Sequence, residues 1–270
     1  MPNKTMKKIL LLAFGALAIG LSSCNQDGCI DPTALNYDPN AKNDDGSCVY
    51  LAENLNFRFY NKLGTQDFAY NTEVQSESGR MVKFTRAQMY MSGFSFNGTG
   101  GSYELTDPHL LLKADQQDYN LGYLPEDQYT SFSFSAGVDS VSNHLDPASF
   151  AGTSALSANN PDHMHWGWDP GYIFYVLEGM VDTTADMTGN VDAPFIFHVG
   201  MDMHRVDLAF VSNVNSVSDG VTVEVDVDWL RLLDGTNMTG DTDTRSTHTM
   251  NNPPLAALMV SNIDEAITLH

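Results

Sequence analysis

The segment from His163 to Tyr172, HMHWGWDPGY, places two imidazoles, a thioether and two indoles close together in the chain. In an extended strand, residues two apart project from the same face, so His163 and His165 would point in the same direction. Two neighbouring imidazoles can chelate a transition metal, and imidazole suits both copper and zinc. The segment therefore predicts part of a metal site that needs one or two further ligands from another strand.

A second run of histidines and methionines supplies candidates for those ligands. In FHVGMDMH, unbroken alternation would put His198 and His204 on one face and the two methionines on the other. Thioethers favour cuprous copper over zinc, so the two runs together favour copper. We expect His198 or His204 to complete the site. The side chains expected to surround the ligands and limit solvent access are Trp166, Trp168, Met164, Met201 and Met203.

The same residue types also occur without any metal. A single histidine is most often solvated, a methionine on a strand usually fills the core, and a tryptophan usually packs. The grouping of His163 and His165 with two indoles and a second His/Met run favours metal binding over these alternatives. Signatures of other chemistry are absent from the sequence, which contains no His-Glu-x-x-His, P-loop, Gly-x-Ser-x-Gly or Cys-x-x-Cys.

The start of the chain has the pattern of an export signal. Three lysines precede an apolar run from Ile9 to Leu21 that is short for a membrane span. Leu-Ser-Ser-Cys, ending at Cys24, resembles a bacterial lipobox, in which the cysteine is diacylated and becomes the mature N-terminus. We expect a leader over residues 1–23 and a lipid at Cys24, which would anchor the protein in the cell envelope, at the periplasmic face of the outer membrane or at the cell surface. An ordinary secretory signal is the alternative.

A polar module, residues 24–50, follows the leader. Cys29 and Cys48 bracket it, and in an oxidising compartment such a pair most simply forms a disulfide. Its closely spaced oxygen donors suit calcium, although the EF-hand spacing is absent. The candidate calcium ligands are Asp38, Asn40, Asp44 and Asp45. A polar spacer without an ion is the alternative.

The charge balance limits the partners. The chain has 34 acidic and 13 basic residues, a formal net charge of −21 at pH 7. Nucleic-acid phosphates need a basic footprint, so we expect no nucleic acid as partner. An acidic surface suits cations and solubility instead.

From Leu51 onward the sequence has the period of two that is typical of strands. Leu55, Phe57 and Phe59 alternate with polar residues, and similar runs recur up to residue 227, separated by turn residues. The pattern predicts one domain, residues 51–270, with an all-β fold: an antiparallel β-sandwich, barrel-like, with one short C-terminal helix. That helix is expected over residues 261–267, and the polar residues 234–254 are expected to form a loop.

HMHWGWDPGYIFYVLEG, followed by APFIFHVG, resembles the MbnP-like family of exported copper-binding proteins, named after the methanobactin-associated periplasmic protein. The earlier FTRAQMYMSGFSF, and the stretch from Tyr103 to Val138 with Asn143 after it, are similar to the same family. The resemblance covers roughly residues 51–270, and its most specific part lies between Trp166 and Gly179. The loop between the cysteines resembles instead a short Asp-rich module found in secreted surface proteins.

The resemblance implies a β-sandwich that holds one copper ion through histidines. In some members a kynurenine, an oxidised tryptophan, lies two residues before a ligand histidine. His165 matches that ligand histidine, but His163 stands where the tryptophan would be, which suggests a third imidazole in its place. For the remote ligand the resemblance implies His198, with His204 as the alternative.

Three functions are therefore open. The leading hypothesis is a lipid-anchored copper-binding protein of the cell envelope that is not an enzyme. The second is a surface recognition module that binds a glycan or an envelope partner protein through its acidic face and an exposed platform of Trp166, Trp168 and Tyr172. The third is a redox or hydrolytic enzyme with an open metal position.

Overall fold

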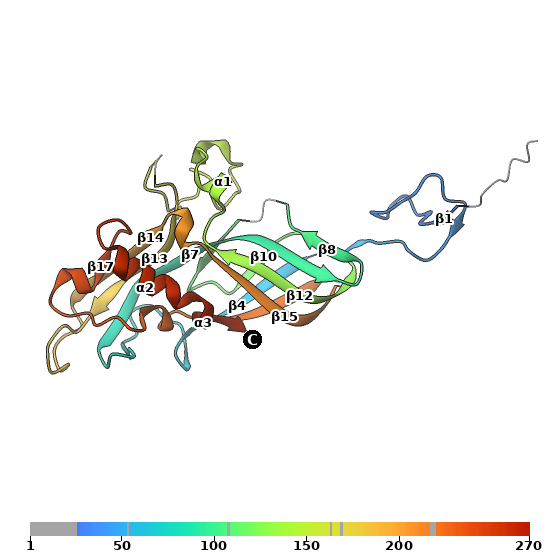
Figure 1. Ribbon diagram of the computed structural model, residues 1–270. Coiled ribbons are helices and arrows are strands. Elements are labelled where there is room, and N and C mark those ends of the chain that lie inside the picture. Colours follow the sequence, from blue (N-terminus) through green and yellow to red (C-terminus); the bar gives the residue numbers. More distant parts are fainter. Residues whose placement is uncertain (1–25, 53, 107–108, 163, 168–169, 217–219) are drawn as a thin grey trace, which may run out of the picture. The chain divides into compact units, whose positions relative to one another are not determined.

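A computed structural model describes residues 26–52, 54–106, 109–162, 164–167, 170–216 and 220–270 (Figure 1). The expected leader and Cys24 lie outside these residues. The chain divides into two compact units, Met1–Cys48 and Val49–His270. Within the described residues, no helix is long and apolar enough to cross a membrane.

In the small unit, two short strands pair in parallel, β1 (Asp27–Gly28) and β2 (Asn43–Asp44). Cys29 is buried and bonded to Cys48, which confirms the predicted disulfide. The segment from Cys29 to Cys48 has few apolar residues to bury, so a covalent link between its ends is an effective way to restrict its unfolded chain.

The larger sheet of the second unit has the strand order β15-β12-β7-β13-β14-β17, with β6, β8 and β9 also paired to β7. The bounds are β6 Val74–Gln75, β7 Met81–Gly98, β8 Gly101–Glu104, β9 Leu110–Lys113, β12 Asp127–Ala136, β13 Ile173–Val181, β14 Ala193–Gly200, β15 Val206–Ser216 and β17 Ser246–Thr247. With 18 residues, β7 is long enough to pair with β12 near one end and with β13 near the other. The β13–β14 hairpin therefore extends the sheet along the first half of β7.

The smaller sheet has the order β10-β4-β16-β18, with β5 paired to β4. Its strands are β4 Leu55–Leu63, β5 Gln66–Asp67, β10 Asp118–Asn120, β16 Val221–Asp228 and β18 Ile267–Leu269; a separate pair joins β3 Leu51–Ala52 to β11 Leu124–Pro125. β4 and β16 run parallel, which differs from the purely antiparallel expectation. Parallel neighbours need a long crossover, and here more than 150 residues, which include most strands of the larger sheet, lie between Leu63 and Val221.

The core lies between the two sheets and is rich in aromatic rings. Leu55, Phe57 and Phe59 are fully buried, as the period of two predicts. The Phe57 ring makes edge contacts with Phe94 of the larger sheet at 5.1 Å and with Phe132 at 5.9 Å between centroids. This confirms the β-sandwich. In the described part of the chain no strand belongs to both sheets, so the sandwich stays open and does not close into a barrel.

The C-terminal region contains more helix than expected. α3 (Ile263–Ala266) falls inside the predicted helical segment, but the longer α2 (Pro253–Ser261) precedes it and begins inside the expected loop. Prolines are tolerated in a first helical turn, and the Asn252 side chain accepts a hydrogen bond from the N–H of Leu255. α2 packs beside β14 and β17 at one end of the larger sheet (Figure 1).

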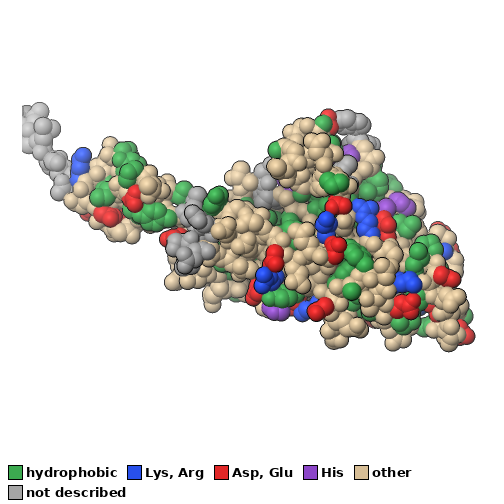
Figure 2. All heavy atoms as spheres, turned by 180° about the vertical axis from the view of Figure 1, so that it is seen from behind, with side chains coloured by type: hydrophobic (Ala, Val, Ile, Leu, Met, Phe, Trp, Pro, Cys, Tyr) green, Lys and Arg blue, Asp and Glu red, His purple; other side chains and the backbone are tan. Residues whose placement is uncertain are grey.

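A long excursion connects β12 to β13 and contains α1 (Ser140–Asn143) and a 3-10 turn, Pro147–Ser149. It projects from the sheet in Figure 1. Further 3-10 turns are η2 (Asp202–His204), η3 (Arg231–Leu233) and η4 (Thr242–Thr244). On the face that Figure 2 shows, basic side chains lie next to acidic ones. Ion pairs such as Lys62–Asp226 at 2.6 Å and Lys113–Asp162 at 2.8 Å use the few basic residues, so the excess charge stays with the carboxylates.

Candidate metal centre

The β13–β14 hairpin turns one face toward the core and carries Glu178 and His198 on the other. Leu177 and Phe197 are fully buried on the inner face, whereas Glu178 and His198 project from the outer face and are only partly exposed. His198 Nε2 lies 2.8 Å from Glu178 Oε1. Arg86 of β7 lies behind this pair, with Nη1 at 3.6 Å from the same carboxylate oxygen.

A second histidine, His248, approaches this pair from a distant part of the sequence. Strand β17 runs parallel to β14 with Thr247 opposite Phe197, so the next residue, His248, reaches His198. The two imidazole rings lie edge to face, with 4.9 Å between their centroids. Sequence reasoning missed His248 because it follows a strand of two residues, which is too short to show an alternating pattern.

Hydrogen bonds fix the backbone around the two rings. The Thr249 hydroxyl accepts from the N–H of Gly200 at 3.0 Å and donates to the carbonyl of His198 at 3.2 Å. The N–H of His248 donates to Asn251 Oδ1 at 2.6 Å. The loop after β17 is therefore tied to the end of β14. The distance between the two histidines does not depend on the contact between their own rings alone.

Glu178 and His248 both have shifted pKa values. The hydrogen bond from His198 holds the pKa of the Glu178 carboxyl below its ordinary value, the Arg86 charge adds to this effect, and burial opposes it. Burial lowers the pKa of His248, and the neighbouring His198 lowers it further. Near neutral pH the carboxyl is therefore ionised and His248 is a neutral imidazole with a free electron pair, the form that binds a metal.

Trp166 covers the same region of the hairpin. Its indole is half-buried and packs against Gly200, since a Cβ built on that glycine would come 2.8 Å from Cζ3 of the ring. Gly200 lies two residues beyond His198 on β14, where a strand presents the same face. The indole is thus placed beside the face that carries the two histidines.

His165 has different described neighbours. Its ring packs edge-on against Tyr172 at 4.6 Å between centroids, and its Nδ1 accepts from the N–H of Gly167 at 2.9 Å. Tyr172 and Met164 are buried in the core, and the N–H of Met164 donates to the Tyr90 hydroxyl at 3.0 Å. Among the described contacts, the His165 ring shares no neighbour with His198. His163 and Trp168 lie outside the described residues.

His204 is not on the face that carries His198. β14 ends at Gly200, and Met201 has a φ of 77°, so the expected alternation does not continue to residue 204. His204 lies in η2, is buried, and has Nδ1 at 2.7 Å from the carbonyl oxygen of Gly200. Met203, in the same turn, is 77% exposed. The turn therefore places His204 in a structural position under the end of the strand.

The comparisons with known proteins agree with this fold. The family model named MbnP matches residues 52–251. The chain belongs to the MbnP family. MbnP from Methylosinus trichosporium superposes with a TM-score of 0.52 at 14% identity, over 77% of this chain and 87% of that one. At this identity the likeness concerns the fold alone.

A curated protein matches only a short segment of this MbnP-family chain. It is ribulose bisphosphate carboxylase/oxygenase activase 1, chloroplastic, from Larrea tridentata, which is 71% identical over 24 residues. The match covers 9% of this chain and 5% of the activase. So small a share of the activase says nothing about the domain that carries the histidines.

The described part of this MbnP-family chain contains no group of three or more His, Cys, Asp or Glu side chains placed to hold a metal ion. His198 and His248 thus offer two imidazoles, with Glu178 engaged to one of them. The calcium candidates form local turns: Asp38 Oδ1 accepts from the N–H of Asn40, and Asp44 and Asp45 accept from the N–H groups two residues further on. Their carboxylates are therefore accounted for by turn hydrogen bonds.

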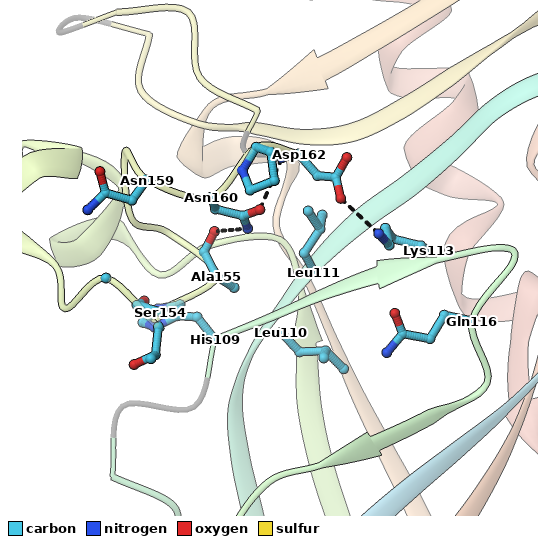
Figure 3. Close-up of a pocket in the computed structure, with 13 residues that line it drawn as sticks. His109, Leu110, Leu111, Lys113, Gln116, Ser154, Ala155, Asn159, Asn160 and Asp162 are labelled. Atoms are coloured by element: carbon cyan, nitrogen blue, oxygen red, sulfur yellow. Dashed lines mark hydrogen bonds and ion pairs between the residues drawn. The ribbon is translucent and has the colours of Figure 1, made fainter.

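A separate cleft of 410 Å³ lies between β9 and residues 152–162 of the excursion (Figure 3). Leu110 and Leu111 line it, together with amide and hydroxyl side chains. The ion pair of Lys113 with Asp162 lies at its edge, and Asn160 donates to the carbonyl of Ala155 at 2.9 Å. Amides and hydroxyls beside apolar side chains can bind a neutral polar ligand.

Proposed function

We propose that this MbnP-family chain is a copper-binding protein of the cell envelope, held there by a lipid on Cys24 and without enzymatic activity of its own. The observation that carries the proposal is the hydrogen bond between His198 and Glu178, at 2.8 Å. A carboxylate that accepts from Nε2–H fixes the tautomer of an imidazole and leaves Nδ1 as a lone pair for a metal. Such pairing is common behind metal-bound histidines.

Copper is the metal that the chemistry of the region favours. Imidazole binds copper well, and the acidic chain attracts cations. The half-buried Trp166 packs on Gly200, two residues from His198, and would limit solvent access to a metal bound there, which would affect both affinity and redox state. The resemblance to exported copper-binding proteins of the same family points in the same direction.

The test is copper uptake by the purified protein without its expected leader and lipid site, residues 25–270. After loading with copper and removal of excess ion, inductively coupled plasma mass spectrometry should find copper bound in the wild type and strongly reduced in His198→Ala. His270→Ala is the matched control. It also removes one imidazole, but His270 follows β18 of the smaller sheet and stacks on Tyr60. A wild type that retains no copper, or equal copper in all three proteins, would refute the proposal.

The segment HMHWGWDPGY enters the proposal as a source of further imidazoles. A His163→Ala/His165→Ala double variant should bind copper more weakly than the wild type, since the predicted ligands are removed. Equal affinity would restrict the site to residues outside this segment. Lipid attachment is checked separately: the full-length chain should be found in the membrane fraction, and Cys24→Ala in the soluble fraction.

A second candidate function is recognition of a glycan in the cleft of Figure 3. It is favoured by the combination of Leu110 and Leu111 with the amides of Gln116 and Asn159. The expected aromatic platform does not support it, because Tyr172 is fully buried. A glycan array in the presence of EDTA would show binding that Asn159→Ala abolishes, and an array without any bound glycan would reject this function.

A further inference from the structure

We propose that His248 is a copper ligand and that His198 and His248 together form a two-imidazole copper site, oriented from behind by Glu178. This inference rests on the proposed function and makes it specific, because it names a ligand that lies about fifty residues beyond the other one in the chain. The site joins three strands: β13 supplies the carboxylate, β14 one imidazole and the residue after β17 the other.

The distance between the rings fits a shared metal ion. Metal–nitrogen bonds of about 2 Å place two ligand nitrogens at most about 4 Å apart. The centroids of His198 and His248 are 4.9 Å apart with an angle of 80° between the ring planes. The two rings are therefore close enough to share one ion, provided that His198 keeps its hydrogen bond to Glu178 and the His248 ring turns to bring a nitrogen toward it.

The backbone holds this arrangement in place before any metal binds. Ile196 lies opposite Ser246 and Phe197 opposite Thr247, and continuing the parallel register brings His198 opposite His248. Thr249 then bonds to both the carbonyl of His198 and the N–H of Gly200. A site whose ligands are fixed by strand pairing loses little conformational entropy when the ion binds, which favours affinity.

Glu178 decides which nitrogen of His198 is available. Because its carboxylate lies 2.8 Å from Nε2, that nitrogen carries the proton and Nδ1 is the atom that can bind copper. The Arg86 guanidinium, at 3.6 Å from the carboxylate, partly neutralises the negative charge of Glu178. The pair of imidazoles therefore contributes two nitrogen donors, and Glu178 acts as a positioning residue.

A site with two imidazoles remains coordinatively open. Closed structural metal sites have a complete set of protein ligands, whereas sites with open positions can exchange ligands. A copper ion held by His198 and His248 could therefore be passed to another carrier by ligand exchange.

The experiment compares copper affinity in the wild type, His248→Ala, His248→Gln, Glu178→Gln and the control His270→Ala. Competition with a chromophoric chelator gives the affinity for Cu(I), and electron paramagnetic resonance of the Cu(II) form reports the number of bound nitrogens. We expect both His248 variants to lose one nitrogen signal. Loss of an outer hydrogen-bond partner costs roughly 10- to 100-fold in affinity, so Glu178→Gln should fall in that range and the His248 variants beyond it.

The outcomes separate the two proposals. A wild type that binds no copper would refute the proposed function. A wild type that binds copper, with unchanged affinity and nitrogen signal in both His248 variants, would overturn this inference and leave the proposed function standing. His248→Gln keeps a polar side chain of similar length, and thermal unfolding of each variant shows whether the fold is retained, so that a loss of copper is assigned to the ligand.

Discussion

The indole of Trp166 lies against the α-carbon of Gly200, at the position where any other residue would place its Cβ. The same Cβ would come 2.4 Å from the carbonyl oxygen of Tyr172. Gly200 therefore allows the end of β14, which carries His198, to come close to Trp166 and Tyr172.

Substitution of Gly200 should loosen this contact. Gly200→Ala forces the backbone of Tyr172 or the ring of Trp166 to move, and overpacking of this kind typically costs about 1–3 kcal/mol. We expect a lower midpoint of thermal unfolding and a red shift of tryptophan fluorescence as the indole becomes more exposed. Gly240→Ala is the control, because a Cβ there meets nothing within 4 Å. Equal midpoints for the two variants would mean that Trp166 does not pack on Gly200.

Asn143 should hold the backbone of Tyr172, close to Trp166, in place. It is fully buried, its Oδ1 accepts from the N–H of Tyr172 at 2.8 Å, and its Nδ2 donates to Asp202 Oδ1 at 2.8 Å. Asn143→Ala leaves a buried N–H without its acceptor, which costs about 1–3 kcal/mol. Chemical denaturation should show this loss, whereas Asn213→Ala on the exposed side of β15 should change stability little. A loss of similar size in both variants would contradict this role.

The stability of the loop that connects β13 and β14 should depend on pH through the carboxyl group of Asp182. Hydrogen bonds from the backbone and hydroxyl of Thr184, and from the N–H of Gly189, hold the pKa of the Asp182 carboxyl below its ordinary value of 3.8. A carboxyl with a lowered pKa in the folded state contributes stability above its ordinary pKa, and this contribution is lost as the pH falls through the folded value.

We therefore expect Asp182→Asn to be less stable than the wild type at pH 7, with the difference shrinking below about pH 4. Unfolding midpoints measured from pH 7 down to pH 3 check this directly. A difference that stays constant over that range would show that the charge of the carboxylate is not what stabilises the loop.

His204 should contribute to stability and not to copper binding. Its Nδ1–H donates to the carbonyl of Gly200 at 2.7 Å, and its own carbonyl accepts from the buried Tyr175 hydroxyl at 2.9 Å. His204→Ala removes a buried hydrogen bond at the end of β14, for a loss of about 1–3 kcal/mol. At a temperature where the variant is folded, its copper content should equal that of the wild type. Loss of copper from a folded variant would return His204 to the ligand set.

The alternating residues predicted the strands well because alternation is a local property of an extended backbone. The burial of Leu55, Phe57 and Phe59 and the outward position of His198 both follow from it. The disulfide was also predictable, since the chain has three cysteines and the expected lipid site at Cys24 leaves only Cys29 and Cys48 to pair. The same local pattern failed at Met201, where a positive φ ends the strand and turns His204 into the interior.

The sequence by itself determined the class of the fold, the disulfide and the family of this protein. Only the tertiary structure decided which histidine lies next to His198. His248 follows a two-residue strand that is held in place by its partner β14, so its position depends on a pairing between segments about fifty residues apart. Hydrophobic periodicity shows which face of a segment is buried. Which other segment lies beside it depends on how the strands of the whole sheet pair.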